Sequence, residues 1–409
     1  MDRAESHPPQ LFFLAADRET QTCCSTFHNT TPYTNINTNT TLHKPTLPTP
    51  TKQHHHNCFT MARDNLSIVL AERPTTDIIP GQTFTQKTSP APTPADLQDG
   101  QILVETLYLS LDPAMRGWLR DMRSYLPPVQ IGQTMRGSCA CRVLASKSKQ
   151  AKEGDIVSAL TGWTEFAILP EGRFEPASLY PGLQDPKDML SALGMTSLTA
   201  WVGMSKIADP KPGELVVVSG AAGATGSVAG QIAKLKGARV VGIAGGDDKC
   251  KWLTEELGFD VGLNYKADDF KEKFAEATKD YIDVYYDNVG GDILDMCLMR
   301  AKEHARFIEC GLVSQYNAAK PQGPRAFSQI VTMRIRMQGF IVLDHVKDFP
   351  AARAELAQWI AEGKLKKTET VVRGGLKVAE QALVDLYKGI NTGKLIVEIK
   401  NHNETPSKL

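Results

Sequence analysis

The spacing of hydrophobic residues changes along the chain, and the clearest change lies between residues 215 and 244. Leu215–Val218 form a continuous apolar run, which is typical of a parallel strand buried on both faces. Val228, Ile232 and Leu235 then recur at helical spacing, and Arg239–Ala244 return to a strand-like run. The pattern therefore predicts a strand, a turn, a helix and a second strand in close succession.

The rest of the chain divides into two zones by the same criterion. Residues 62–188 consist of short alternating strands, beginning with Ser67–Leu70, separated by turns that contain Gly or Pro. Strands and helices alternate over residues 189–345, and residues 346–400 end in a strand, Leu395–Ile399, that we expect to return to the first zone. We expect an α/β protein with two domains.

A glycine-rich turn follows the apolar run at Leu215. Gly220, Gly223 and Gly226 fall between the predicted strand and helix, with Ala221 at the usual place of the first fingerprint glycine. Such a turn lets a pyrophosphate approach the backbone, and the helix start offers free N–H groups to the anion. The context of strand, turn and helix favours a dinucleotide site over a turn that binds nothing.

The end of the second strand indicates which dinucleotide is bound. NAD sites usually place a carboxylate there, whereas this strand ends in small residues. Lys249 and Tyr265 follow nearby, and an ammonium with a phenol donor suits a 2′-phosphate. Asp247 and Asp248 argue mildly against this interpretation, although they also suit a helix N-terminus. The residues favour NADP(H) over NAD(H).

Two further strands are predicted to end at the same edge of the sheet. Ile282–Asp287 precedes Asn288, and Arg306–Cys310 precedes Gly311. Ligands of open parallel sheets lie beyond the carboxyl ends of the strands. We therefore expect Asn288 and the loop from Gly311 to Asn317 to face the nicotinamide half of the cofactor.

Composition and the two ends of the chain bear on partners and location. Among 409 residues, 46 Lys and Arg balance 46 Asp and Glu, which makes nucleic acid or an acidic membrane an improbable partner. The eight cysteines are scattered, as in a reducing compartment. We expect residues 1–61, which are rich in Thr, Asn and Pro, to form a disordered arm. Translation starting at Met61 is an alternative. We expect the polar tail, residues 401–409, to be flexible. Its last residues, Ser407-Lys408-Leu409, match a peroxisomal import signal. Without import we expect a cytoplasmic protein.

The chain resembles the zinc-independent medium-chain dehydrogenase/reductases, specifically the prostaglandin reductase and alkenal or enone double-bond reductase group. Six segments carry the resemblance, in family order: Leu109–Arg116, Gly194–Ala200, Ala221–Gly226, Asp287–Gly291, Cys310–Asn317 and Gly389–Lys394. It implies a GroES-like β-barrel domain plus a Rossmann domain, with a doubly wound parallel sheet and NADPH in the cleft between them. It also implies a homodimer joined through the segment Met337–Leu343.

The resemblance also implies roles for individual residues. The implied cofactor contacts are Gly223, Ala224, Thr225, Gly226, Lys249, Tyr265, Asn288, Cys310, Tyr316, Phe340, Val342 and Asn391. Many such reductases place a tyrosine after the Asp-Pro pair, where this chain has Ala114. We therefore expect a wider substrate pocket, and substrate identity does not transfer.

The expected chemistry is metal-free reduction of a conjugated C=C bond. Residues 62–400 contain two histidines, His304 and His345, neither in a ligand-spaced motif, and the pair Cys139 and Cys141 is interpreted as core rather than as a metal site. Reduction needs a hydride at the β-carbon and a donor for the enolate oxygen. Tyr316 is the candidate catalytic residue, although it alternatively only packs against or positions the cofactor.

Other assignments remain open. Asp112 and Arg116 are more simply turn and interdomain residues than catalytic ones. Reduction of a quinone or a biosynthetic enoyl group is the alternative within the enzymes, and a non-catalytic NADPH-binding protein is the alternative outside them. Hydrolysis by a serine or cysteine nucleophile is improbable, because the available histidines lack motif context.

Overall fold

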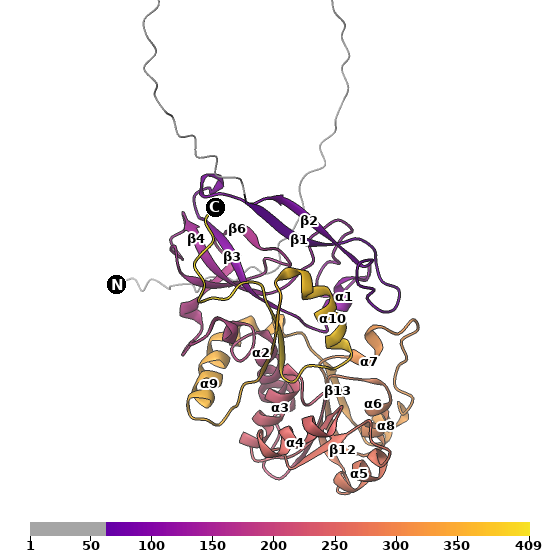
Figure 1. Ribbon diagram of the computed structural model, residues 1–409. Coiled ribbons are helices and arrows are strands. Elements are labelled where there is room, and N and C mark those ends of the chain that lie inside the picture. The colour runs from indigo at the N-terminus through magenta and orange to yellow at the C-terminus, as the bar shows by residue number, and fades with distance from the viewer. Residues whose placement is uncertain (1–62) are drawn as a thin grey trace, which may run out of the picture. The chain divides into compact units, whose positions relative to one another are not determined.

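The computed structural model describes residues 63–409. The expected arm, the possible start at Met61 and three of the eight cysteines lie outside the described residues. Within the described part, two main sheets are formed by segments that follow each other in the chain, and the last strands return to the first sheet (Figure 1).

The first sheet is antiparallel over most of its extent and has the strand order β14-β15-β3-β4-β5-β7, with β6 also paired to β3. A separate hairpin of β1 and β2 lies against it through bridges from Ser67 to Thr164 and from Val69 to Thr134. The strands are β1 (Asp64–Leu70), β2 (Phe84–Pro90), β3 (Gln101–Ser110), β4 (Cys139–Ser146), β5 (Ile156–Ala159), β6 (Phe166–Pro170), β7 (Phe174–Pro176), β14 (Glu369–Arg373) and β15 (Lys394–Glu398).

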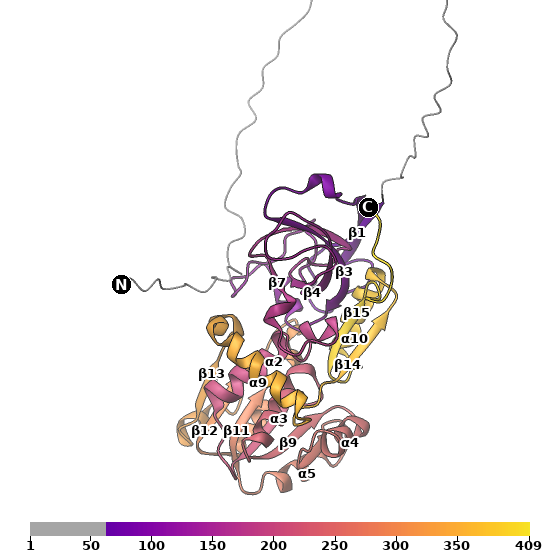
Figure 2. The ribbon, with the colours of Figure 1, turned by 90° about the vertical axis from the view of Figure 1, so that its left-hand side faces the viewer.

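The helices of this part are α1 (Met115–Trp118) and α10 (Ala379–Tyr387). The predicted return of the chain is confirmed, because β15 pairs antiparallel with β3 and parallel with β14. Figure 2 shows the yellow C-terminal strands beside the indigo and magenta strands of this sheet.

The second sheet is parallel, with the strand order β10-β9-β8-β11-β12-β13. Relabelled from β8, this is the order 3-2-1-4-5-6 of the doubly wound dinucleotide-binding fold. Its strands are β8 (Leu215–Ser219), β9 (Arg239–Ala244), β10 (Val261–Asn264), β11 (Ile282–Asp287), β12 (Ala301–Glu309) and β13 (Arg336–Gly339). The strand predicted over Arg306–Cys310 is β12. It begins earlier, at Ala301, and ends at Glu309, so Cys310 lies just beyond it.

Both faces of the parallel sheet are covered, which explains the continuous apolar run that begins at Leu215. Successive side chains of β8 point to opposite faces, so Val216 and Val218 join one core cluster while Leu215 and Val217 join another. The helices of this part are α2 (Met195–Val202), α3 (Ala224–Leu235), α4 (Asp247–Glu255), α5 (Phe270–Ala277), α6 (Gly291–Met299), α7 (Val313–Tyr316), α8 (Ser328–Thr332) and α9 (Phe349–Ala361).

Two segments connect the parts of the described chain. Phe349, Ala352 and Leu356 of α9 pack in a core cluster that holds residues of both sheets, such as Tyr108 and Val216, and the chain pairs with the antiparallel sheet again at β14. The tail 401–409 makes hydrogen bonds with the antiparallel sheet. Arg142 donates to the carbonyl oxygens of His402 and Glu404, and Ser407 binds the side chain of Glu105. Buried charges on β3 and β4 thus find partners in the tail.

Candidate functional site

The carboxyl end of β8 is shaped by glycines at the positions of the predicted fingerprint. Gly220 has a φ of +56°, a left-handed conformation that favours glycine. A Cβ at Gly226 would overlap the Gly220 carbonyl oxygen and come within 2.9 Å of the Ala221 Cα. The helix α3 then begins at Ala224, and its first amides lack partners within the helix. Gly223, Ala224, Thr225 and Gly226 therefore lie together, as predicted, where a pyrophosphate can bind.

A C-terminal segment closes over this turn. Gly393 forms a bridge with Gly223 and donates its N–H to the Ala222 carbonyl at 2.8 Å. Asn391 is buried, and its side-chain amide donates to the Gly393 carbonyl at 2.8 Å. The predicted contact residue Asn391 thus lies beside the glycine turn, where it also holds the shape of its own loop.

Lys249 follows β9 and Tyr265 follows β10, so both lie near the carboxyl ends of these two paired strands. A Cβ at Gly245 would lie 2.9 Å from the Tyr265 ring and 3.2 Å from the side chain of Lys266. Lys249, in α4, donates to the carbonyl oxygens of Gly389 and Asn391 at 2.6 and 2.5 Å. Burial lowers the pKa of Lys249, and the positive charge of Lys266 acts in the same direction.

This group of Lys249, Tyr265 and Lys266 is called the cationic corner below. Two ammonium groups that disfavour each other's charge are stabilised by an anion placed between them. Asp247, which argued against a phosphate, accepts from the side chain of Asn264 at 2.8 Å. Lys266 was missed in the sequence analysis, although its position next to Tyr265 was a usable signal.

At the carboxyl end of β11, Asn288 is fixed to the end of β8. Its backbone N–H donates to Ser219 Oγ at 2.9 Å, and its side-chain amide donates to the Ser219 carbonyl at 2.7 Å. Cys310 follows β12 and donates its N–H to the Asp287 carbonyl at 2.9 Å. Burial raises the pKa of the Cys310 thiol to about 12, so this side chain is a neutral thiol at physiological pH.

Tyr316 joins the two parts of the described chain. Its hydroxyl accepts from the Leu312 N–H at 3.2 Å, and its carbonyl accepts from Arg120 at 2.6 Å. Arg120 follows α1, so it brings the first part of the chain against α7. Burial raises the pKa of Tyr316, with smaller contributions from Cys310 and Tyr125. The phenol is therefore protonated and can donate a hydrogen bond.

Phe340 and Val342 follow β13 at the same edge of the sheet. Gly339, the last residue of β13, pairs with Glu309 of β12. The side chains of Phe340 and Val342 pack against the core cluster that contains Val216 and Val218 of β8. The structure thus brings the predicted backbone segment 340–342 to the carboxyl ends of the strands that also carry Cys310.

A second phenol, Tyr125, lies near Tyr316. The Tyr125 hydroxyl accepts from Trp118 Nε1 at 3.0 Å, and it is close enough to Tyr316 to contribute to the raised pKa of that phenol. Tyr387 of α10 also faces this region and donates to the Pro113 carbonyl at 3.0 Å. The sequence analysis missed Tyr125 and Tyr387, because no local motif connects them to Tyr316.

Asp112 and Arg116 have structural partners, as expected. The Arg116 guanidinium is buried and donates to the carbonyl oxygens of Pro74 and Thr76 at 2.7 to 3.0 Å. Asp112 accepts from Lys394 at 2.5 Å. Cys139 and Cys141 are buried in β4, in agreement with the core interpretation. Among residues 63–409, no group of three or more His, Cys, Asp and Glu side chains could hold a metal ion.

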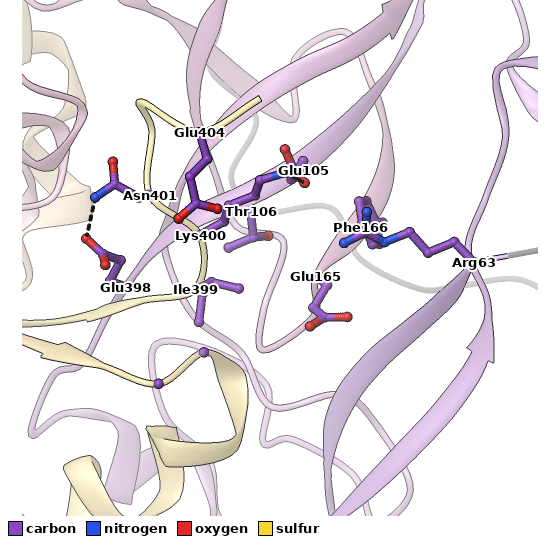
Figure 3. A pocket seen from close by; sticks show the side chains of 12 residues that line it. Arg63, Glu105, Thr106, Glu165, Phe166, Glu398, Ile399, Lys400, Asn401 and Glu404 are labelled. Atoms are coloured by element: carbon purple, nitrogen blue, oxygen red, sulfur yellow. Dashed lines mark hydrogen bonds and ion pairs between the residues drawn. The ribbon is translucent and has the colours of Figure 1, made fainter. Parts of the chain in front are cut away.

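A cavity of about 360 Å³ lies apart from these residues, between β3, the start of β6 and the C-terminal segment (Figure 3). Its walls carry the glutamates 105, 165, 398 and 404 together with Arg63 and Lys400. An anionic nucleotide is a poor match for such a wall. In the described part of the chain, no helix is both long and apolar enough to cross a membrane.

The fold and the residues at the carboxyl edge of the parallel sheet define a two-domain, dinucleotide-binding oxidoreductase. Comparison with known proteins agrees with this class. Residues 67–176 match the family model of the N-terminal domain of oxidoreductases, and residues 224–359 match the model named zinc-binding dehydrogenase. The chain belongs to the medium-chain dehydrogenase/reductase superfamily, in the group of prostaglandin, alkenal and curcumin reductases.

Three relatives illustrate the similarity. The NADPH-dependent curcumin reductase of Escherichia coli is 41% identical, over 81% of this chain and 96% of its own. The NADP-dependent 2-alkenal reductase of Nicotiana tabacum is 36% identical, over 73% of this chain and 87% of its own. The crystal structure of CurA from Vibrio vulnificus in complex with NADPH has a TM-score of 0.76 and 40% identity, covering 82% of this chain and 99% of CurA.

Proposed function

We propose that the protein is an NADPH-dependent reductase of the C=C bond of α,β-unsaturated aldehydes and ketones. The observation that carries the proposal is the pairing, along one sheet edge, of the cationic corner with a half-buried, protonated phenol at Tyr316. The similarity to curcumin and 2-alkenal reductases supports the same reaction class. The residues present fit NADPH: the corner would hold the 2′-phosphate, the turn from Gly223 to Gly226 the pyrophosphate, and Asn288 with residues 340–342 the nicotinamide end.

Tyr316 would stabilise the oxygen on which negative charge develops. When bound, NADPH would supply the hydride for the β-carbon, and Tyr316 would meet the charge that develops on the carbonyl oxygen as the C=C electrons shift toward it. The Tyr316 hydroxyl already accepts from the Leu312 N–H, so its own hydrogen is free to donate to that enolate oxygen. A proton from solvent or from a ribose hydroxyl then reaches the α-carbon and completes the reduction.

The substrate would lie between Tyr316 and the segment that follows α1. Alanine at position 114 is smaller than the tyrosine of many relatives, and the phenol of Tyr125, which is bonded to Trp118, would be available to the substrate instead. Tyr125 and Tyr316 would then present aromatic rings and phenol donors to a conjugated carbonyl compound.

The proposal is tested by following NADPH oxidation with a short 2-alkenal, a cyclic enone and a quinone in parallel. We expect rapid oxidation with the alkenal or the enone and a saturated carbonyl product. Oxidation with the quinone alone would favour the alternative reduction. Tight NADPH binding without oxidation by any of the three substrates would favour a non-catalytic NADPH-binding protein.

We further propose that the protein is a homodimer joined through β13. This strand lies at the edge of the parallel sheet and pairs only with β12 within the described chain. An edge strand with unpaired backbone groups is suited to pairing with a second copy. Light scattering during gel filtration at micromolar concentration should give twice the mass of one chain, and a monomer mass would contradict this.

We also propose that Ser407-Lys408-Leu409 directs import into peroxisomes. The position of this tripeptide at the C-terminus of the sequence supports the proposal. Because Ser407 binds Glu105, and Lys400 bonds both Glu105 and Ser407, a receptor would first have to release the tail. A fluorescent protein fused to the N-terminus should be found in peroxisomes, and deletion of residues 407–409 should leave it in the cytosol. Identical distributions would reject the signal.

A further inference from the structure

Two carboxyl groups lie side by side at the carboxyl ends of β11 and β12. Asp287 and Glu309 are register partners in these parallel strands, so their side chains share one face of the sheet. Asp287 is fully buried. Its Oδ1 atom accepts four hydrogen bonds of 2.8 to 2.9 Å, from Ser219 Oγ, the Tyr285 hydroxyl, and the N–H groups of Val289 and Gly290.

The other halves of the two carboxyl groups have no such partners. Asp287 Oδ2 and Glu309 Oε1 are both buried, and neither forms a hydrogen bond with the described residues. Two adjacent buried carboxylates are costly, and a buried acceptor without a donor adds a further cost. One proton held between the two groups removes both costs, because a protonated carboxyl group is itself a donor.

The surroundings decide which group carries the proton. Burial raises the pKa of Asp287, but its four hydrogen-bond donors act against burial and favour the anion there, whereas Glu309 has no such donors among the described residues and faces that anion. Burial raises the pKa of Glu309 from its ordinary value of 4.5 to about 8, and the charge of Asp287 acts in the same direction. The other titratable groups that face the pair are Tyr285, Cys297, Cys310 and Tyr316, and burial raises the pKa of each. All four are therefore neutral near pH 7.

We propose that Glu309 is a positioning residue that donates its proton to Asp287 and so holds the turn from Asn288 to Gly290 for the nicotinamide end of the cofactor. This rests on the proposed placement of the nicotinamide at that turn. Asp287 ties three segments together: the end of β8 through Ser219, the turn after β11, and the loop after β12 through the amides of Cys310 and Gly311 on its carbonyl. Loss of the proton from Glu309 places a second anion beside this junction.

The test compares Glu309→Gln with the intact chain. Glutamine keeps the shape and a permanent donor but cannot ionise. For the intact chain, the Kd for NADPH measured by fluorescence should rise about tenfold between pH 7 and 9.5, with a midpoint near pH 8. For Glu309→Gln the step near pH 8 should be absent, and a weakening that comes from Lys249, whose pKa is lowered by burial, should be the same in both proteins. Glu303→Gln, at an exposed position of the same strand, is the matched control and should behave like the intact chain.

Asp287→Asn serves as a second variant. The amide would donate to an ionised Glu309 and still accept at Oδ1, so the step near pH 8 in NADPH binding should again be absent. An alkaline weakening of the same size and midpoint in Glu309→Gln or in Asp287→Asn would overturn the proposal, as would a pH-independent Kd in the intact chain.

The unfolding free energy without cofactor gives a readout that does not depend on turnover. The folded-state pKa of Glu309 lies above its unfolded value, so the folded state binds the extra proton between about pH 4.5 and 8. Its contribution to stability is fully present below pH 4.5 and is lost as the pH rises to about 8. The stability of Glu309→Gln relative to the intact chain should therefore increase with pH over that window and level off above it.

The two readouts separate this inference from the proposed function. Absence of the stability signature would overturn the shared proton. A stability signature with a flat NADPH profile would overturn the positioning role. If both signatures are present while no enone is reduced, the inference is supported and only the proposed reaction fails.

Discussion

The two ends of the candidate cofactor site are built in opposite ways. At the cationic corner, Lys249 and Lys266 carry formal charges at a partly exposed position, and Tyr265 is 47% exposed. At the nicotinamide end, burial keeps Glu309, Cys310 and Tyr316 protonated, and Asp287 holds one negative charge among hydrogen-bond donors.

The difference reflects what each end has to do. A phosphate is recognised by charge, which tolerates small shifts in position and is screened by salt. A hydride donor must be held within a fraction of an ångström of the reacting carbon, which needs a rigid hydrogen-bonded frame. Substitutions at the corner should therefore change cofactor choice and affinity, whereas substitutions at the other end should change turnover and its pH dependence.

The largest effect is expected between the two ends, at Gly226. In Gly226→Val the new side chain would overlap the backbone at Gly220 and push α3 away from β8. We expect loss of measurable NADPH binding and a fall of about 2–3 kcal/mol in the unfolding free energy. Calorimetry and urea unfolding measure both. Gly323→Ala, where a Cβ meets nothing within 4 Å, is the control and should change neither quantity.

Tyr316→Phe tests the buried end. Removing the hydroxyl takes away the proposed donor to the enolate oxygen, so kcat with a 2-alkenal should fall about 100-fold while the Kd for NADPH changes little. Steady-state kinetics and a fluorescence titration provide the two numbers. Tyr281→Phe, at an exposed position, is the control. Unchanged kcat together with unchanged affinity would leave Tyr316 without the proposed role.

Lys249→Ala tests the cationic corner. Loss of a charge-assisted bond to the 2′-phosphate should weaken NADPH about 10- to 50-fold and NADH much less. Lys251→Ala, on the same helix and exposed, is the matched control. An equal loss for both cofactors would mean that Lys249 acts through the carbonyl oxygens of Gly389 and Asn391, which it also holds, rather than through the phosphate.

The smallest effect is expected for Lys266→Gln. This ammonium lies at the outer side of the corner, so its removal should weaken NADPH about two- to fourfold, and less at high salt because exposed charges are screened. Titrations at low and high ionic strength measure the change. A loss as large as that of Lys249→Ala, or one that salt does not reduce, would show that both ammonium groups grip the phosphate from within the site.

Local patterns were sufficient to predict the parallel sheet. The apolar run at Leu215, the helical spacing through Leu235 and the three glycines became β8, α3 and the turn between them. Such a unit is readable because a strand buried on both faces and a helix with one buried face leave different periodicities. Most residues given a cofactor role by the family resemblance follow strands of the parallel sheet, whose carboxyl ends meet at one edge, whereas Asn391 lies in the loop before β15.

The sequence alone did not reveal the contacts between residues that are far apart along the chain. Arg120 meets Tyr316 across 196 residues, the tail residue Ser407 reaches Glu105, and Glu309 shares its surroundings with Asp287 only because β12 pairs with β11. Periodicity and motifs report short-range order, whereas a proton shared by two carboxyl groups depends on burial and on neighbours. Those two conditions exist only after the strands have packed side by side.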